Sequence, residues 1–151
     1  MYQHWDANII VVIATGLAVC AVVLTHYEGL SILSRWLVRL HESHRRRKVL
    51  YGIFGVLALH VVEIWIFGVT VWILSQLPDT GGVAGVHALN LLDAVYLAAT
   101  TYTTLGFGDL APVGPLRFLA GTMALTGFVL ITWSASFTYL EMSRDWRERG
   151  R

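Results

Sequence analysis

The chain has 151 residues, of which 56% are hydrophobic and only 14% are charged. Soluble domains average about 25% charged residues, so the composition disfavours a cytosolic enzyme and a disordered tail. Proteins that bind nucleic acid usually carry an excess of basic residues, and the formal net charge here is only +1. We therefore do not expect nucleic acid as a partner. The single cysteine excludes an intrachain disulfide framework and a cysteine-based zinc site. This composition is typical of a membrane protein.

Three runs are long enough to cross a membrane, which takes about 20 mainly apolar residues. Residues 7–25 and 118–140 carry no charge, and residues 49–77 carry only His60 and Glu63 as ionisable groups within the apolar run. The sequence therefore predicts an all-α membrane protein with three transmembrane helices. Because no basic residue precedes the first run, we expect a retained helix there rather than a cleaved signal.

Basic residues are unevenly distributed, and they mark the cytoplasmic side of a membrane protein. Of the eleven, six lie between the first and second runs, four follow the third run, and Arg117 opens the third run. The predicted topology in the cytoplasmic membrane has the N-terminus outside and the C-terminus inside. One basic cluster comprises Arg45, Arg46, Arg47 and Lys48. This cluster is expected either to bind anionic lipid headgroups or only to set the topology.

Residues 1–48 form a first unit, a transmembrane helix followed by a basic linker. Within the linker, leucines recur at helical spacing, at Leu30, Leu33, Leu37 and Leu40. Two structures fit this pattern: an amphipathic helix lying in the cytoplasmic interface, or the first transmembrane helix continuing into the cytosol.

A shorter segment between the second and third runs begins as a helix at Asn90, with Asp93 at the third helical position. About fourteen moderately apolar residues follow and end in a Thr-rich and Gly-rich stretch at residues 100–109. A helix of that length covers about 20 Å and cannot cross a hydrocarbon core of about 30 Å. Non-helical backbone at membrane depth must be buried in protein or line water. We therefore expect a re-entrant pore helix.

The segment closes with the motif Thr103-Thr104-Leu105-Gly106-Phe107-Gly108-Asp109. It resembles the selectivity filter of the potassium channel superfamily, whose common form reads TTVGYGD, and the TTLGFGD form is especially similar to filters of two-pore-domain channels. The alternative interpretation of this motif is a glycine-containing turn at a membrane surface, without a functional role. The resemblance covers a pore domain at residues 49–142 and leaves 143–151 as a short cytoplasmic tail. With one filter segment per chain, it implies a homotetramer that conducts K+ passively, without an organic cofactor.

A dehydrated K+ ion needs oxygen ligands to replace its water. The expected ligands are the hydroxyl of Thr104 and the carbonyl oxygens of Thr104, Leu105, Gly106 and Phe107. Gly106 and Gly108 allow backbone angles that turn consecutive carbonyls inward. The side chains of Leu105 and Phe107 are expected to pack outward against the pore helices.

Three residues are expected to support the filter. Asp109 would lie at the outer mouth and accept a hydrogen bond from Tyr96 on the pore helix, as the resemblance implies. Thr103 lies at the end of the pore helix, whose negative dipole end would face an ion in the cavity below.

The third run is expected to line that cavity. The side chains proposed to share the cavity face are Met123, Thr126, Leu130, Ser134 and Phe137. Phe137 is the candidate for a hydrophobic constriction. Gly121 and Gly127 are expected to serve either as gating hinges or as close-packing points between helices.

His60 and Glu63 share a face of the second run, and ionisable groups inside a membrane usually face protein or water. The pair is expected to be either a proton-sensitive gating element or a structural anchor around the filter. The remaining histidines, His4, His26, His41, His44 and His87, are expected to be solvated surface residues rather than ligands.

The main prediction is a potassium-selective channel. Its alternatives are a weakly selective cation channel of the same fold and a non-conducting accessory membrane protein. An enzyme is not expected, since no nucleophile, base and metal constellation occurs in the runs.

Overall fold

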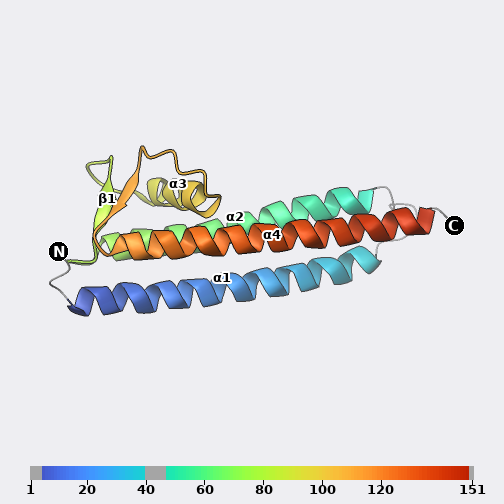
Figure 1. Cartoon of the computed structure of the whole chain (residues 1–151), viewed down its shortest axis with the longest axis horizontal. Helices are drawn as coiled ribbons and strands as arrows, with labels where there is room; N and C mark the ends of the chain where they lie inside the picture. Colours follow the sequence, from blue (N-terminus) through green and yellow to red (C-terminus); the bar gives the residue numbers. More distant parts are fainter. Residues whose placement is uncertain (1–4, 40–46, 150–151) are drawn as a thin grey trace.

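The computed structural model describes residues 5–39 and 47–149. Three long helices run side by side, α1 (Trp5–Arg39), α2 (Lys48–Ser75) and α4 (Leu116–Arg149), as Figure 1 shows. Each contains a segment long and apolar enough to cross a membrane. The prediction of an all-α membrane protein with three spanning helices is confirmed.

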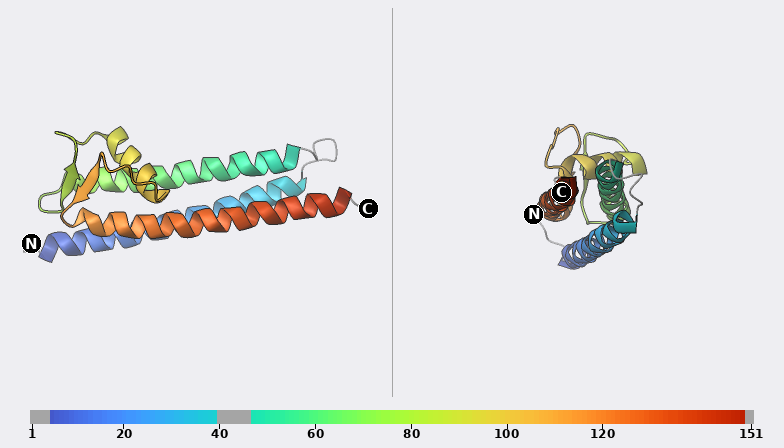
Figure 2. Two further views of the ribbon diagram at one scale, coloured as in Figure 1. Left: turned by 45° about the horizontal axis from the view of Figure 1, so that its top comes forward. Right: turned by 90° about the vertical axis from the view of Figure 1, so that its right-hand side faces the viewer.

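The short helix α3 (Leu91–Tyr102) lies at one end of the bundle. It packs on α2 and α4, while α1 packs on these two helices from the opposite side, as the end-on view of Figure 2 shows. We call the end of the bundle that carries α3 the α3 end. The four helices therefore form a bundle in which α2 and α4 separate α1 from most of α3.

Helix α1 is continuous from Trp5 to Arg39. Its buried side chains recur every three or four residues and form one stripe: Ala7, Val11, Thr15, Ala18, Val22, His26, Leu30 and Leu37. Of the two structures open for the leucine-rich linker, continuation of the first helix is therefore the one observed. Leu40 lies outside the described residues.

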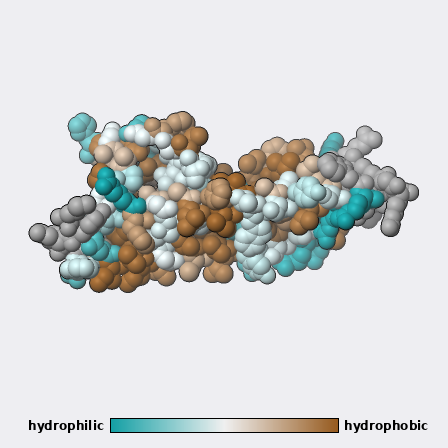
Figure 3. All heavy atoms as spheres, in the orientation of Figure 1, coloured by the Kyte–Doolittle hydropathy of each residue, from teal (hydrophilic) through white to brown (hydrophobic). Residues whose placement is uncertain are grey.

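The outward faces of the long helices remain apolar, which suits contact with lipid. Hydrophobic residues cover much of the visible face of the bundle, and strongly hydrophilic residues gather toward its ends (Figure 3). Outward-facing examples are Leu17 on α1, Phe54 on α2 and Phe128 on α4. Together with the three spanning helices, this surface identifies an integral membrane protein.

Helix α3 begins as the sequence predicts. The side-chain oxygen of Asn90 accepts a hydrogen bond from the Asp93 backbone N–H at 2.9 Å and caps the helix. The helix has 12 residues and is thus about 18 Å long, too short to cross a bilayer. The chain enters α3 and leaves the filter motif at the same end of the bundle, as a re-entrant segment does (Figure 1).

Two short strands, which the sequence pattern does not predict, tie this end together. Strands β1 (Gly82–Ala84) and β2 (Ala111–Val113) pair antiparallel, with Gly82 opposite Val113. The pair joins the segment before α3 to the segment after the filter motif. At the other end of the bundle, residues 143–149, which belong to the expected cytoplasmic tail, are helical and continue α4.

Candidate ion pathway

The filter motif has an alternating backbone. Thr104, Gly106 and Gly108 have φ angles of +58°, +55° and +82°, whereas Leu105 and Phe107 between them do not have positive φ. Alternation between positive and negative φ turns successive peptide groups toward the same side. Glycine adopts positive φ without steric cost, and Thr104 does so against the preference of a β-branched side chain. Such conformations concentrate at functional sites, where the surrounding structure holds them.

The start of the filter is a direct continuation of α3. The backbone N–H groups of Thr104 and Gly106 donate to the carbonyl oxygens of Thr101 and Thr100, at 2.9 and 3.0 Å. The Thr103 hydroxyl, expected to support the filter, donates to the Ala99 carbonyl at 2.8 Å. The last turn of α3 therefore fixes where the filter begins.

The end of the filter is tied to the same helix. The hydroxyl of Tyr96 donates to the carboxylate of Asp109 at 2.8 Å, which is the hydrogen bond expected from the sequence. This bond, with a smaller contribution from desolvation and from the carboxylate charge, raises the pKa of Tyr96 above its ordinary value. Helix α3 thus holds both ends of the filter motif.

The middle of the filter is uncovered in a single chain. Leu105 and Phe107, expected to pack outward against pore helices, are 61% and 67% exposed. Gly106 and Gly108 have open space around their Cα atoms. Large apolar side chains exposed side by side are typical of interaction surfaces.

The predicted cavity face of α4 is wrong. Thr126, Leu130 and Ser134 are 9%, 2% and 3% exposed, and they pack within their own chain, as Met123 does at 0%. Side chains this deeply buried in one chain have no surface left to line a wet cavity between chains. Phe137 is half-buried and follows Ser134 at a spacing of three, on the same inward face. The exposed side of α4 is a different one, and its middle forms a stripe that comprises Gly121, Leu125, Phe128, Thr132 and Ser136. We call these five residues the exposed stripe.

The error has a physical cause. A helix that is apolar all round shows no contrast in polarity by which its inward face could be told from its pore face. Small polar residues occur on both sides of α4. The hydroxyls of Thr132 and Ser136, on the exposed stripe, donate to the carbonyl oxygens of Phe128 and Thr132. Thr126 on the inward face makes the same kind of bond, to the Thr122 carbonyl. Hydroxyl groups alone therefore did not distinguish the two faces.

The two glycines of α4 differ. A Cβ atom on Gly127 would lie 2.0 Å from the carbonyl oxygen of Tyr102, so this glycine is a close-packing point between α4 and α3. Gly121 is exposed, and a Cβ atom there would meet no atom within 4 Å. Close packing, one of the two roles open for these positions, is thus observed at Gly127 only.

Glu63 is the centre of a buried polar cluster. It is 0% exposed, and one carboxylate oxygen lies 2.7 Å from Nδ1 of His26 on α1. The other oxygen accepts a hydrogen bond from the hydroxyl of Tyr102, the last residue of α3, and lies 2.9 Å from Nδ1 of His60. Nδ1 of His60 is also 2.9 Å from the Tyr102 hydroxyl oxygen. We call these four residues the Glu63 cluster; it joins α1, α2 and α3.

His26 corrects the expectation that it is a solvated surface residue, because it is 0% exposed. Its spacing carried the signal. His26 continues the buried stripe of α1 four residues after Val22 and four before Leu30, and the predicted apolar run stopped one residue too early to include it. His87 is not buried, in line with the expectation for a surface residue. His4, His41 and His44 lie outside the described residues.

The basic cluster of the linker is only partly visible. Arg45 and Arg46 lie outside the described residues, Arg47 is exposed, and Lys48 begins α2. These two described residues lie at the end of α2 opposite the α3 end (Figure 1).

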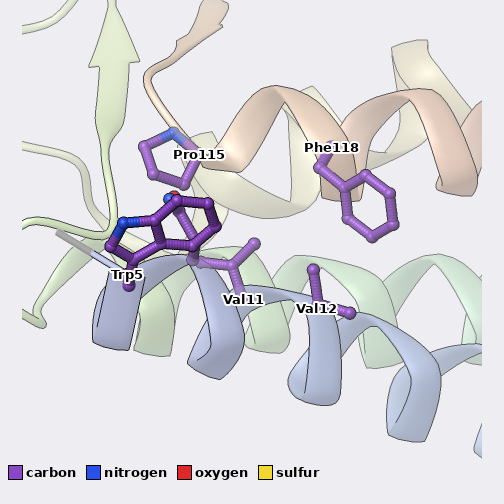
Figure 4. A pocket seen from close by; sticks show the side chains of 6 residues that line it. Trp5, Val11, Val12, Pro115 and Phe118 are labelled. Atoms are coloured by element: carbon purple, nitrogen blue, oxygen red, sulfur yellow. The ribbon is translucent and has the colours of Figure 1, made fainter. Parts of the chain in front are cut away.

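A hollow of about 420 Å³ lies between the first turns of α1 and the start of α4 (Figure 4). Its lining is formed by Trp5, Asn8, Val11, Val12, Pro115 and Phe118. These side chains include no titratable group and none of the filter motif, so the hollow adds nothing to the chemistry of the filter.

A re-entrant helix, an alternating filter backbone and flanking spanning helices define a pore-loop channel. A family model described as ion channel matches residues 49–142, and the chain belongs to this family. The match includes α2, α3, the filter motif and most of α4, and it excludes α1.

Two curated relatives are similar over much of the chain. Protein LctB of Geobacillus stearothermophilus is 29% identical over 104 residues, which cover 66% of this chain and 78% of that protein. Protein LctB of Bacillus caldotenax is 28% identical over 106 residues, with the same two coverages. No solved structure matches the chain.

Proposed function

We propose that this ion channel is selective for K+ and conducts passively through a homotetrameric pore in the cytoplasmic membrane. The alternating backbone of Thr104, Gly106 and Gly108 is the observation that carries the proposal. Successive carbonyl groups turned to one side provide stacked oxygen ligands once several copies surround an axis. The transported K+ ions would be bound by carbonyl oxygens from Thr104 to Phe107 and by the Thr104 hydroxyl, with Gly108 completing the turn.

Four copies would also explain the surface of the single chain. Leu105 and Phe107 are the exposed apolar side chains beside the filter, and packing against neighbouring copies would remove them from water. In that assembly Asp109, held by Tyr96, would lie at the outer mouth and attract cations.

The exposed stripe of α4 is our candidate for the cavity wall, in place of the inward face. Gly121, Leu125, Phe128, Thr132 and Ser136 follow one another at spacings of four, three, four and four. Thr132 and Ser136 would give the wall its polar atoms.

The orientation follows from the distribution of basic residues. The N-terminus and the α3 end would face outside, and the basic linker and C-terminal residues would face the cytoplasm. Arg47 and Lys48, with Arg45 and Arg46 before them, would then lie beside the inner leaflet, where anionic headgroups gather.

Two alternatives make different predictions. A weakly selective cation channel would share the fold but would not discriminate K+ from Na+. A non-conducting accessory protein would share the fold and carry no flux.

K+ efflux from liposomes that contain the purified full chain tests the proposal. We expect efflux that Ba2+ blocks and that an equal Na+ gradient does not reproduce. Gly106→Ala should abolish it, because alanine costs about 1–2 kcal/mol in the left-handed conformation and would tilt the carbonyl. Gly16→Ala is the matched control, since a Cβ atom there meets open space on α1.

Equal K+ and Na+ fluxes would favour the weakly selective channel. No flux under any pH or lipid composition would favour the accessory protein.

A further inference from the structure

We propose that His26 is a positioning residue for the filter, although it lies on α1, outside the matched ion channel domain. It acts through Glu63 on Tyr102, the residue directly before the filter motif. The inference deepens the proposed function and rests on it for its electrical readout, but not for its structural one.

Glu63 of α2 bridges α1 and α3. The two oxygens of the Glu63 carboxylate are divided between helices: one is 2.7 Å from Nδ1 of His26 on α1, and the other accepts from the Tyr102 hydroxyl on α3. Both His26 and Glu63 are 0% exposed, so water does not compete for these bonds. The carboxylate therefore holds the last residue of α3 in a fixed relation to α1.

Tyr102 is connected in turn to the filter. Tyr102 is fully buried, and its backbone carbonyl packs against Gly127 of α4. The amides of Thr104 and Gly106 donate to carbonyl oxygens one and two residues before Tyr102, at Thr101 and Thr100. A shift of the Tyr102 ring would therefore move the turn to which the filter is bonded.

Loss of His26 would destabilise the bond between Glu63 and Tyr102. A buried carboxylate in a membrane is expensive unless its oxygens are hydrogen-bonded. Without the His26 donor, one oxygen of Glu63 has no partner, and the carboxylate must either rotate or take up a proton. Either change weakens the bond from Tyr102. The extra helix α1 thus stabilises the arrangement of α3 that places the filter.

Each of the four helices contributes a side chain to the surroundings of Glu63. His26 faces it from α1, His60 from α2 and Tyr102 from α3. Helix α4 contributes the Trp133 ring, whose centroid is 5.1 Å from that of His26.

A metal site fits the cluster less well. Donor atoms of His26, His60 and Glu63 lie within 4.8 Å of one another, as metal ligands do. Metal-bound imidazoles, however, donate their second ring N–H to an acceptor. Within the described part of the chain, Nε2 of His26 is buried and has no hydrogen-bond partner. Nδ1 of His26 and Nδ1 of His60 are instead paired with the carboxylate oxygens of Glu63.

Amide hydrogen exchange on the full chain in lipid nanodiscs tests the positioning role without any need for conduction. In His26→Ala, we expect the peptide that covers residues 100–108 to exchange about ten-fold faster, because a broken buried bond shifts the local opening equilibrium by that order. Tyr102→Phe removes only the hydroxyl and should raise exchange at the same residues. This variant replaces His26→Ala in the test if His26→Ala fails to fold. Val22→Ala is the control, one turn away on the same buried stripe. Exchange at residues 100–108 that is unchanged in the variants, or equally raised in Val22→Ala, would overturn the proposal.

A double-mutant cycle on channel opening tests the path. If His26 acts through Glu63, His26→Ala should lower the ratio of open to closed channels in wild type about ten-fold and change little in a Glu63→Gln background. Additive effects in the cycle would contradict action through Glu63. If wild-type channels carry no K+ current, the proposed function fails, and hydrogen exchange still decides the role of His26.

Discussion

Tyr96 and Asp109 form a single bond, at 2.8 Å, between α3 and the residue that closes the filter motif. Tyr96→Phe keeps the ring and removes the bond. Because the Asp109 end of the filter then loses this tie to α3, we expect K+ flux to decay faster under constant conditions. Tyr139→Phe is the control, because Tyr139 is an exposed tyrosine in the C-terminal half of α4. A decay rate equal to that of wild type would show that the bond does not stabilise the filter.

The same bond predicts a pH dependence with a definite sign. Since the pKa of Tyr96 is raised when its hydroxyl donates to Asp109, its stabilising effect is present below the ordinary tyrosine pKa of about 10. The effect is lost only as pH rises through the raised value. The difference in decay rate between wild type and Tyr96→Phe should therefore stay constant from about pH 6 to 9. A difference that disappears within this range would contradict the assignment of Tyr96 as the donor.

Gly127 allows a close approach of α4 to α3, whereas a Cβ atom on Gly121 would meet none of the described residues within 4 Å. Gly127→Ala places a Cβ atom 2.0 Å from the Tyr102 carbonyl oxygen, and overpacking of this kind costs about 1–3 kcal/mol. Gly121→Ala should leave stability unchanged or raise it, through helix propensity. Thermal unfolding of the two variants in one detergent measures the difference. Equal midpoints would show that the contact at Gly127 relaxes without cost.

Individual residues were predictable where the backbone demands them. Gly106 and Gly108 are needed for positive φ, and the Tyr96 and Asp109 pair followed from the filter resemblance. The cavity residues Thr126, Leu130 and Ser134 were not predictable, because membrane helices are apolar on every side and lack the polarity contrast that orients soluble helices. The role of His26 required the fold, since its partner Glu63 is 37 residues away.

At the scale of elements, the two faces of α4 make opposite predictions for cysteine accessibility. In a Cys20→Ser background, Thr132→Cys and Ser136→Cys should react with a hydrophilic thiol reagent and lose K+ flux, because both positions are on the exposed stripe. Ser134→Cys should not react, as Ser134 is 3% exposed. The reaction is followed by mass spectrometry and by flux. If Ser134→Cys were modified in preference to the other two variants, the inward face of α4 would be the one that lines the cavity.

The helices were easier to predict than their ends and their connections. The three spans follow from length and hydropathy, and the start of α3 follows from the Asn90 cap. The extension of α1 to Arg39 was one of two possibilities, because a leucine stripe fits both an interfacial helix and a packed one. Strands β1 and β2 escaped prediction, since three-residue strands show no periodic pattern and pair across the whole pore-loop segment.

For the whole molecule, the exposed filter predicts an assembly. A single chain leaves Leu105 and Phe107 more than half exposed beside Gly106 and Gly108. We expect native mass spectrometry in detergent to give one assembly of four chains. Glu28→Gln, on the exposed side of α1, should leave this assembly intact. Chains that remain single or pair as dimers at all protein concentrations would leave the filter without the ring of carbonyl groups that K+ requires.

The central claim is that this ring of carbonyl groups selects K+. The most direct test is the reversal potential of the reconstituted full chain in a planar bilayer, with K+ on one side and Na+ on the other. If the filter coordinates K+ as proposed, the reversal potential follows the K+ gradient as that gradient is varied. A reversal potential that stays near zero with equal K+ and Na+ concentrations on opposite sides would contradict K+ selectivity.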